Sequence, residues 1–418
     1  MNLVGFIVFL MPCFSFGLSF NEALSVLENR DQLILVKKAE VRKAQAELWS
    51  SRSLFFPALY AKGVETQKND ATYSRTKLGT LGGKINLFHG GSDWASINSS
   101  RASLESEKSQ LTETILTREL KNLEYLVNYV KADLQVKVAK NIFQLNQSLE
   151  EIQQARYQKG LIPLQEAQKA TIEKSNSEAK LRDAENSFSA ASAVLRSELG
   201  SLDVTSDTWP WTSFLTPNLA AAWLKKDFKV QQVPSWKSAQ ESLEAQDQSE
   251  RAKFRDFLPS LDLSVDYGYF DYESRKDTGW LTTLTLTVPL MDLKQHADYR
   301  VQVAQKSIAQ KQLEVARRNA EADFEQGSAR LQTSLQTAAH REKSRQMALS
   351  LYEDTQRRLR AGRSSLNDTL VDQSRLAEAE YLTITGWAEA HLQYARFCHA
   401  LGMRLNPSQF GCLPVVAE

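Results

Sequence analysis

Residues 53–60 read SLFFPALY, and residues 255–262 read RDFLPSLD. Each stretch closes a run of helix-forming residues with a Phe, a second apolar residue and a proline. Because the residue before a proline is disfavoured in the helical region, both stretches are predicted to end a helix. Pro57 and Pro259 lie 202 positions apart (259 − 57) in a chain of 418 residues. The same helix end is used twice, which indicates an internal duplication.

The 202-residue interval recurs at other landmarks, which follow one another in the same order. The matching pairs are Gly160 and Gly362, Leu164 and Leu366, and Leu199-Gly200 and Leu401-Gly402. We therefore predict two copies of one unit, at residues 18–200 and 235–403. Residues 201–234 would link them, and residues 404–418 would form a C-terminal tail.

Each copy is predicted to contain a helix, a strand pair, a long helix, a turn and a further helix. The strand pairs are expected at about 57–88 and 259–290, and the second has the clearer pattern. There apolar and polar residues alternate with the period of two that is typical of a strand with one apolar face. The residues predicted on that face are Leu261, Leu263, Val265, Leu284, Leu286 and Val288. The polar stretch 271–280, DYESRKDTGW, is predicted to be a loop between the strands.

Two stretches are predicted to be very long helices. After Gly91 no Pro or Gly occurs before Gln158, and apolar residues recur at steps of three and four from Leu116 to Ile152. A helix of this length would extend ~100 Å, and 293–361 is of similar length. Alternating steps of four and three residues form heptads, and additional four-residue steps interrupt them. These interruptions reduce supercoiling and favour a nearly straight helical bundle.

The composition excludes several classes of protein. With 51 basic and 50 acidic residues, the net charge is +1. The sequence therefore lacks the basic excess that is typical of nucleic-acid-binding proteins. The five His are scattered and HExxH is absent, so no metal site is expected. The stretch from Gly79 to Lys84 lacks the first Gly and the Ser or Thr of a phosphate-binding loop. We therefore expect that the protein is not an enzyme and that it binds no cofactor and no metal.

The N-terminal segment 1–17, MNLVGFIVFLMPCFSFG, is predicted to be a signal peptide that is cleaved near Ser15-Phe16-Gly17. An uncleaved anchor is the competing interpretation, but the apolar run is short for a membrane span. After removal of Cys13, Cys398 and Cys412 could pair in an oxidising compartment, and the sequence leaves this open. Beyond Phe20 no stretch reaches the ~20 apolar residues of a membrane helix, so any entry into a membrane must use strands.

Four strands cannot span lipid alone, because the edge strands would leave unpaired N–H and C=O groups. Closed membrane barrels need at least about eight strands, so several chains would have to share one, and three would provide twelve. The alternative is a soluble sheet that packs on helices.

Several stretches carry a family resemblance. They are the start LSFNEALSVL at 18–27, Phe257-Leu258-Pro259, Val288-Pro289-Leu290, the turn from Tyr157 to Gly160, and the closing Leu-Gly pairs. In these the chain resembles the TolC family of outer-membrane efflux channels. Asn86 departs from the pattern, since the family usually has Pro there. The resemblance implies a mainly α fold with membrane β-strands, four per chain. It also implies a homotrimer that closes a β-barrel in the outer-membrane lipid and a barrel of long α-helical hairpins in the periplasm.

The resemblance also implies a function and its sites. The channel would be the exit duct for substrates expelled by an inner-membrane pump of the RND, ABC or MFS type, through a periplasmic adaptor. Adaptor contacts would fall at the hairpin tips, on Gly160, Leu161, Leu164, Gly362, Ser364 and Leu366. The periplasmic gate would use Asp368, Asp372 and Arg363. The alternative function is a soluble periplasmic coiled-coil scaffold with a small sheet.

Overall fold

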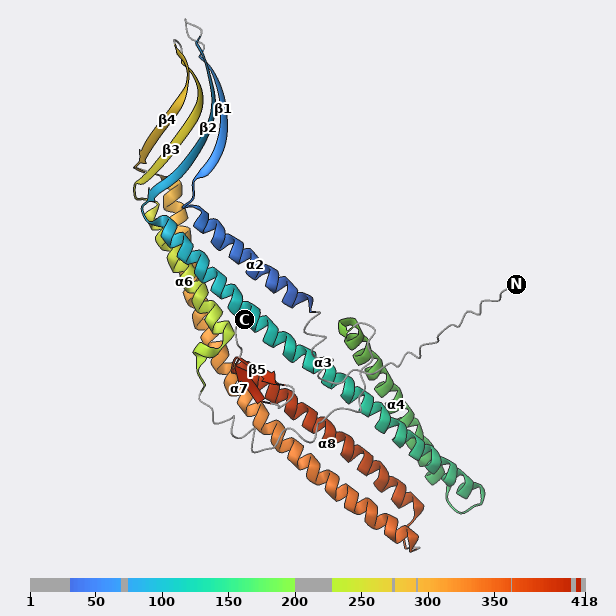
Figure 1. Ribbon diagram of the computed structural model, residues 1–418. Helices are drawn as coiled ribbons and strands as arrows, with labels where there is room; N and C mark the ends of the chain where they lie inside the picture. The colour runs from blue at the N-terminus through green and yellow to red at the C-terminus, as the bar shows by residue number, and fades with distance from the viewer. Residues whose placement is uncertain are drawn as a thin grey trace, which may run out of the picture. The chain divides into compact units, whose positions relative to one another are not determined.

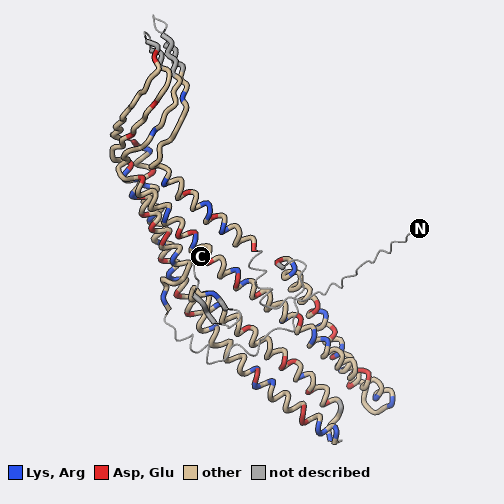
Figure 2. Tube along the Cα trace, in the orientation of Figure 1, with Lys and Arg blue, Asp and Glu red and all other residues tan. Residues whose placement is uncertain are grey.

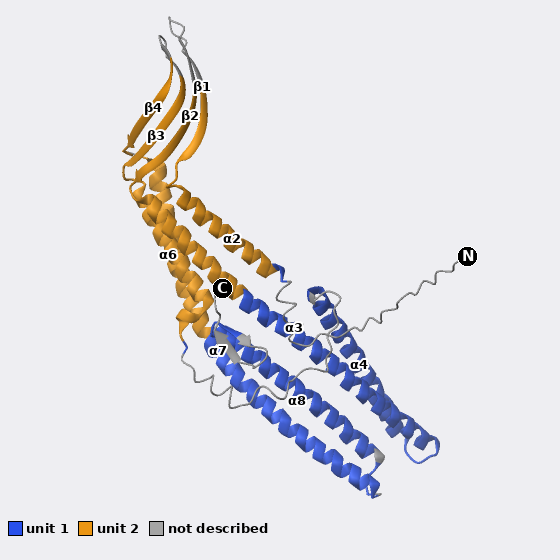
Figure 3. Ribbon diagram, viewed as in Figure 1, with its two compact units in different colours: residues 1–32, 115–228, 323–418 blue, residues 33–114, 229–322 orange. Residues whose placement is uncertain are grey.

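The structure is a computed structural model that describes residues 31–68, 74–199, 228–272, 275–290, 292–361, 363–406 and 411–414. The predicted signal peptide, Gly362 and most of the linker lie outside these residues, and the predictions on them stand as predictions. The chain divides into two compact units (Figure 3). Unit 1 comprises residues 1–32, 115–228 and 323–418, and unit 2 comprises residues 33–114 and 229–322. Each unit holds parts of both predicted copies, because two long helices contribute to both units.

The helices follow the predicted order twice (Figure 1). They are α2 (Gln32–Ser53), α3 (Ser92–Gln158), α4 (Leu164–Leu199), α6 (Pro234–Arg255), α7 (Leu293–Arg360) and α8 (Leu366–Ala400). A short 3-10 turn, Val230–Gln232, precedes α6. The helices α3 and α7 have 67 and 68 residues, which confirms the two long helices predicted from the sequence.

Unit 2 contains one antiparallel sheet in which the two copies meet. The strands are β1 (Ala58–Lys68), β2 (Ser74–His89), β3 (Ser260–Tyr272) and β4 (Arg275–Thr287), in the order β1-β2-β3-β4. The central pair, β2 and β3, joins the first copy to the second, with Ile85 opposite Leu263. The register shifts between Asn86 and Phe88, so that Phe88 lies opposite Leu261. Such a bulge bends the strand locally near the point where it leaves the sheet.

The prediction of a polar loop at residues 271–280 was wrong. The ladder between β3 and β4 continues to the pair Tyr272 and Arg275, so only residues 273–274 lie between the strands. Backbone pairing does not require apolar side chains, because the ladder bonds join N–H and C=O groups. The alternation of polarity therefore revealed only the inner part of each strand.

The α3 and α6 helices of unit 2 pack through small residues at seven-residue spacing. The hydroxyls of Ser92, Ser99 and Ser106 donate hydrogen bonds to the α6 carbonyl oxygens of Ala252, Ala245 and Ser238, at 3.1, 2.9 and 3.0 Å. Small side chains let two antiparallel helices approach closely, and each hydroxyl reaches the facing backbone. Nearby, Ala44 and Leu48 of α2 form a small core with Ile97 and Leu104 of α3.

Unit 1 is built around two apolar cores. In the first, the α3 residues Leu123, Val127 and Val130 pack against Leu195 of α4 and Leu392 of α8. In the second, α7 meets α8, and its members are Leu331, Tyr394, Phe397, Cys398 and Leu401. The predicted α3 seam is buried at Leu123, Val127 and Val130, but its members from Leu134 to Ile152 are only half-buried. Towards the end of the hairpin, a single chain therefore leaves the seam partly open.

The C-terminal segment, for which the sequence indicated a plain tail, contains a two-stranded hairpin. Strand β5 (Met403–Asn406) pairs with β6 (Gly411–Pro414). Arg404 of β5 pairs with buried Glu119 of α3 at 2.5 Å. Cys398, at the end of α8, is fully buried and disulfide-bonded. The sequence left the pairing of Cys398 with Cys412 open, and the side chain of Cys412 lies outside the described part of the chain.

Candidate channel and docking sites

The tip between α3 and α4 is closed by Gly160. Its φ of 69° is accessible to glycine at little cost. The N–H groups of Gly160 and Leu161 donate to the carbonyls of Tyr157 and Arg156, at 2.8 and 2.9 Å. These two bonds make a Schellman end, which satisfies the last carbonyls of α3.

Two of the predicted docking residues are exposed apolar side chains at this tip. Leu161 is 66% exposed and Leu164 is 48% exposed, beside the half-exposed ring of Tyr157. An exposed cluster of large apolar side chains is typical of a contact surface. The arrangement is compatible with docking, which stays a prediction for these residues.

The tip between α7 and α8 repeats the first tip at the same interval. The N–H of Arg363 donates to the carbonyl of Arg358 at 2.8 Å, which is the bond of Leu161 to Arg156 moved by 202 positions. Of the predicted docking residues here, Ser364 is half-buried. Gly362 and the side chain of Leu366 lie outside the described residues.

Asp368, which the sequence assigned to the gate, forms a capping box at the start of α8. The hydroxyl of Ser365 accepts from the Asp368 N–H, and Asp368 Oδ2 accepts from the Ser365 N–H at 3.2 Å. The hydroxyls of Ser365 and Ser364 also donate to Oδ2, at 2.7 and 3.3 Å. These bonds from Ser365, and then the one from Ser364, lower the pKa of Asp368 because they stabilise its charged form. The carboxylate is exposed, so it has a capping role whether or not it also lines a channel.

Asp372, the second predicted gate residue, is held between the helices of its own hairpin. Its side chain is 10% exposed, and Oδ1 lies 3.0 Å from Arg375. Arg363, the third, is exposed, and within the described ranges no ion pair joins it to Asp368. Among the described residues, Arg363 therefore forms an ion pair with neither Asp368 nor Asp372.

Sequence reasoning missed a row of polar contacts between α3 and α8. Lys131 pairs with Glu389 at 2.8 Å, and Glu124 pairs with Arg396 at 2.6 Å. The partners are more than 250 positions apart in the chain, so no local pattern could have revealed them. Burial raises the pKa of Glu389, but hydrogen bonds from Lys131 and Gln393 outweigh it, and the net shift is downward.

The sheet separates apolar from polar side chains as predicted. Leu261 lies opposite Leu286, and Leu263 opposite Leu284, so these four share one face with Val265. Leu284 and Leu286 are 62% and 65% exposed. Val288 follows the end of β4 and is exposed as well.

The opposite face of the sheet carries a polar network that crosses three strands. The hydroxyl of Tyr60 on β1 donates to Asp266 Oδ1 on β3 at 2.8 Å, past Gly82 on β2. A Cβ at Gly82 would meet Asp266 Oδ1 and the Tyr60 ring, so a larger residue there would have to displace these two side chains. Lys84 lies 3.3 Å from Asp262 on the same face. The sheet is therefore apolar on one side and charged on the other.

The described part of the chain offers no metal centre, since it contains no group of three or more His, Cys, Asp or Glu that could hold an ion. Within the same residues, none of the helices combines the length and the apolar character that crossing a membrane requires.

A long helical hairpin and a strand pair, each occurring twice in one chain, with one two-faced sheet formed by the strand pairs, are features of outer-membrane channel proteins. The sequence matches the outer membrane efflux protein family over residues 23–201 and 230–402, and the chain belongs to that family. Members of this family are channels and not enzymes. They are trimers that work with adaptors and inner-membrane pumps.

Solved structures share the fold at low sequence identity. A membrane protein from Pseudomonas aeruginosa has a TM-score of 0.75 and 14% identity, with 91% of this chain and 89% of that chain covered. The CmeC outer membrane channel of Campylobacter jejuni has a TM-score of 0.74 and 16% identity, with 91% of this chain and 85% of that chain covered. The outer membrane protein VceC of Vibrio cholerae has a TM-score of 0.73 and 16% identity, with 92% of this chain and 96% of that chain covered. No curated protein matches the sequence significantly.

Proposed function

We propose that three copies of this chain close a channel in the outer membrane. This channel is the exit duct for substrates that an inner-membrane pump expels through a periplasmic adaptor. The observation that carries the proposal is the sheet, whose outer strands β1 and β4 each pair on one side only within the described residues. Unpaired strand edges cannot lie in lipid, whereas three sheets joined edge to edge would leave none.

The apolar face of the sheet supports the same proposal. Its exposed leucines and Trp280 would face lipid, and the network of Tyr60, Asp266 and Lys84 would face the aqueous interior. Membrane barrels alternate apolar and polar residues in this way. A soluble scaffold would expose the apolar face to water, and nothing in the described sheet favours that alternative.

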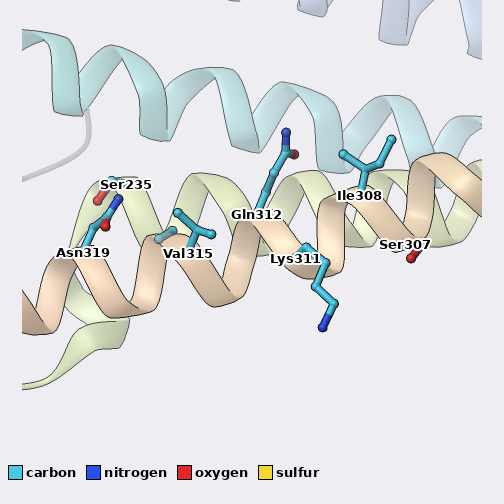
Figure 4. A pocket seen from close by; sticks show the side chains of 8 residues that line it. Ser235, Ser307, Ile308, Lys311, Gln312, Val315 and Asn319 are labelled. Atoms are coloured by element: carbon cyan, nitrogen blue, oxygen red, sulfur yellow. The ribbon is translucent and has the colours of Figure 1, made fainter.

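A stripe on α7 supports association of the chains. Val301, Ile308 and Val315 are seven positions apart and 52%, 56% and 55% exposed. Figure 4 shows Ile308 and Val315 on the same side of α7, beside Gln312. Apolar residues at heptad spacing pack against another helix, and a neighbouring copy of this chain would provide it. The half-buried end of the α3 seam has the same explanation.

The proposal is tested by where the mature chain is found and what it conducts. The membranes of cells that express the full chain are separated on a density gradient, and the size of the protein is measured under native conditions. A trimer in the outer-membrane fraction that conducts ions in planar bilayers is expected. A monomeric periplasmic protein without conductance would establish the scaffold alternative instead. Export is then compared between cells that express the full chain and cells that lack its gene.

A further inference from the structure

The tip of the α7–α8 hairpin carries an excess of exposed positive charge. From position 355 to position 367 the chain contains four arginines and no acidic residue. They are Arg357, Arg358, Arg360 and Arg363, and all four are exposed. Figure 2 shows the basic residues gathered where α7 ends. We call these four residues the arginine tip.

The chain neutralises only part of this charge. Asp354 accepts from Arg358 Nε at 2.7 Å and lies 3.7 Å from Arg357. Arg360 donates to the neutral side chain of Gln356 at 3.3 Å. Among the residues that the structure describes, neither Arg360 nor Arg363 has an ion pair.

The helix dipole accounts for only part of the cluster. A cation in the last turn of a helix is favourable, because it lies near the unsatisfied carbonyls. The equivalent end of α3 has one such residue, Arg156, whereas α7 has three. Arg357 and Arg360 lie three positions apart on the surface of α7, where like charges repel each other. Four arginines are therefore more than the end of α7 needs.

We propose that the arginine tip binds carboxylates of the partner that docks there, so that this partner presents Asp or Glu side chains opposite the α7–α8 hairpin. The inference rests on the proposed function, in which the hairpin tips meet a periplasmic adaptor. Guanidinium groups bind carboxylates in a bidentate geometry that selects acidic side chains. The exposed leucines of the α3–α4 tip add an apolar contact. The two tips thus require different chemistry from the partner.

Photo-crosslinking in intact cells tests this pairing. A photoreactive amino acid replaces Asn367, an exposed residue next to the arginine tip, and the cross-linked peptide is identified by mass spectrometry. The wild-type tip is expected to cross-link to a protein segment that contains Asp or Glu. The double variant Arg360→Glu/Arg363→Glu should lower the yield about tenfold or more, because like charges would then face each other. Arg360→Lys/Arg363→Lys should give an intermediate yield, because lysine keeps the positive charge but loses the bidentate geometry.

The matched control is Arg330→Glu/Lys343→Glu, which makes the same charge change at exposed positions elsewhere on α7. It should leave the yield unchanged. Replacement of the cross-linked partner carboxylate by Arg should restore cross-linking to the Glu variant. Equal yields for wild type and the Glu variant, or cross-links to lipid or to a segment without acidic residues, would overturn the inference.

Two further measurements separate this inference from the proposed function. The Glu variant should still form outer-membrane trimers and conduct ions like the wild type, because the tip lies outside both apolar cores. A wild-type chain that neither trimerises nor conducts would reject the proposed function itself. A wild-type channel that exports, with unchanged cross-linking and export in the Glu variant, would reject only the arginine tip as a docking surface.

Discussion

The hydroxyl of Thr355 on α7 donates a hydrogen bond of 2.7 Å to the buried carboxylate of Asp372 on α8. Both oxygens of Asp372 are therefore engaged within one hairpin, since Arg375 contacts the other one. Asp368, four positions earlier, is exposed and caps the same helix. Two aspartates that the sequence grouped as one gate thus have different surroundings.

This difference predicts different effects of removing the two carboxylates. Asp368→Ala should weaken the block of the channel by cations in planar bilayers, because three exposed copies around one axis would attract them. Asp372→Ala should change the block less but should destabilise the hairpin by about 1–3 kcal/mol, because it leaves the Thr355 hydroxyl buried without its acceptor. Single-channel recordings and thermal unfolding measure the two effects. The same cation block in wild type and Asp368→Ala would leave Asp368 with a capping role alone.

The two faces of the sheet predict which positions tolerate a charge. Leu263→Arg and Leu286→Arg should each hinder insertion, at a cost of about 2–4 kcal/mol at the middle of the membrane. Thr283→Arg is the matched control, since Thr283 pairs with Ser264 and lies on the polar face. It is a better control than Asp266→Arg, which would break the bond from Tyr60. Insertion is measured as the outer-membrane fraction of the protein, and equal losses from all three variants would argue against a lipid-facing side.

At the α3–α4 tip, Leu161→Asp should abolish export and leave the yield of trimers intact. Leu161 is largely exposed and contributes to neither apolar core, so its replacement should affect a contact and not the fold. Export from cells and native gels of the purified protein measure the two properties. Lys159 is exposed in the same turn, and Lys159→Asp is the control for introducing a negative charge there. Normal export by the Leu161 variant would identify this tip as a plain connection.

The ion pair between Lys131 and Glu389 predicts a dependence of stability on pH. The pKa of Glu389 is lowered in the folded chain, so its stabilising contribution is present above the unfolded pKa of about 4.3 and is lost as the pH falls below it. The Glu389 side chain is 40% exposed, and the contribution should stay below about 1 kcal/mol. Glu389→Gln should therefore lower the Tm at pH 7 but not at pH 3. The exposed Glu353 offers a control, Glu353→Gln, that should change the Tm at neither pH.

The close serine contacts between α3 and α6 predict that a larger side chain in this interface lowers the stability of the fold. Ala245 is buried where the hydroxyl of Ser99 reaches its carbonyl at 2.9 Å, so Ala245→Leu should force the two helices apart. Overpacking of this kind costs about 1–3 kcal/mol. Ala239→Leu, at a half-buried position on α6, should cost less. Thermal unfolding of the two variants compares the costs, and equal stability would show that the contact is loose.

Local and periodic features were readable from the sequence because they depend on neighbouring residues. The prolines at 57 and 259 end helices through the restriction on the preceding residue, and α3 follows from its apolar spacing. The duplication was visible because the landmarks recur at one interval, as the tip bonds of Leu161 and Arg363 do. The apolar face of β3 and β4 followed from the alternation of side chains across a strand.

Which strands and helices lie side by side, and which polar groups meet between them, was decided only by the tertiary structure. The continuation of the β3–β4 ladder to Tyr272 and Arg275, the pair of Lys131 and Glu389, and the burial of Asp372 against Thr355 have no local pattern. Each depends on which helix or strand lies alongside, and a polar residue reads the same in a sequence whether it faces water or a partner. The physical reason is that hydrogen bonds and ion pairs are short-range contacts, so their partners are fixed by packing and not by spacing along the chain.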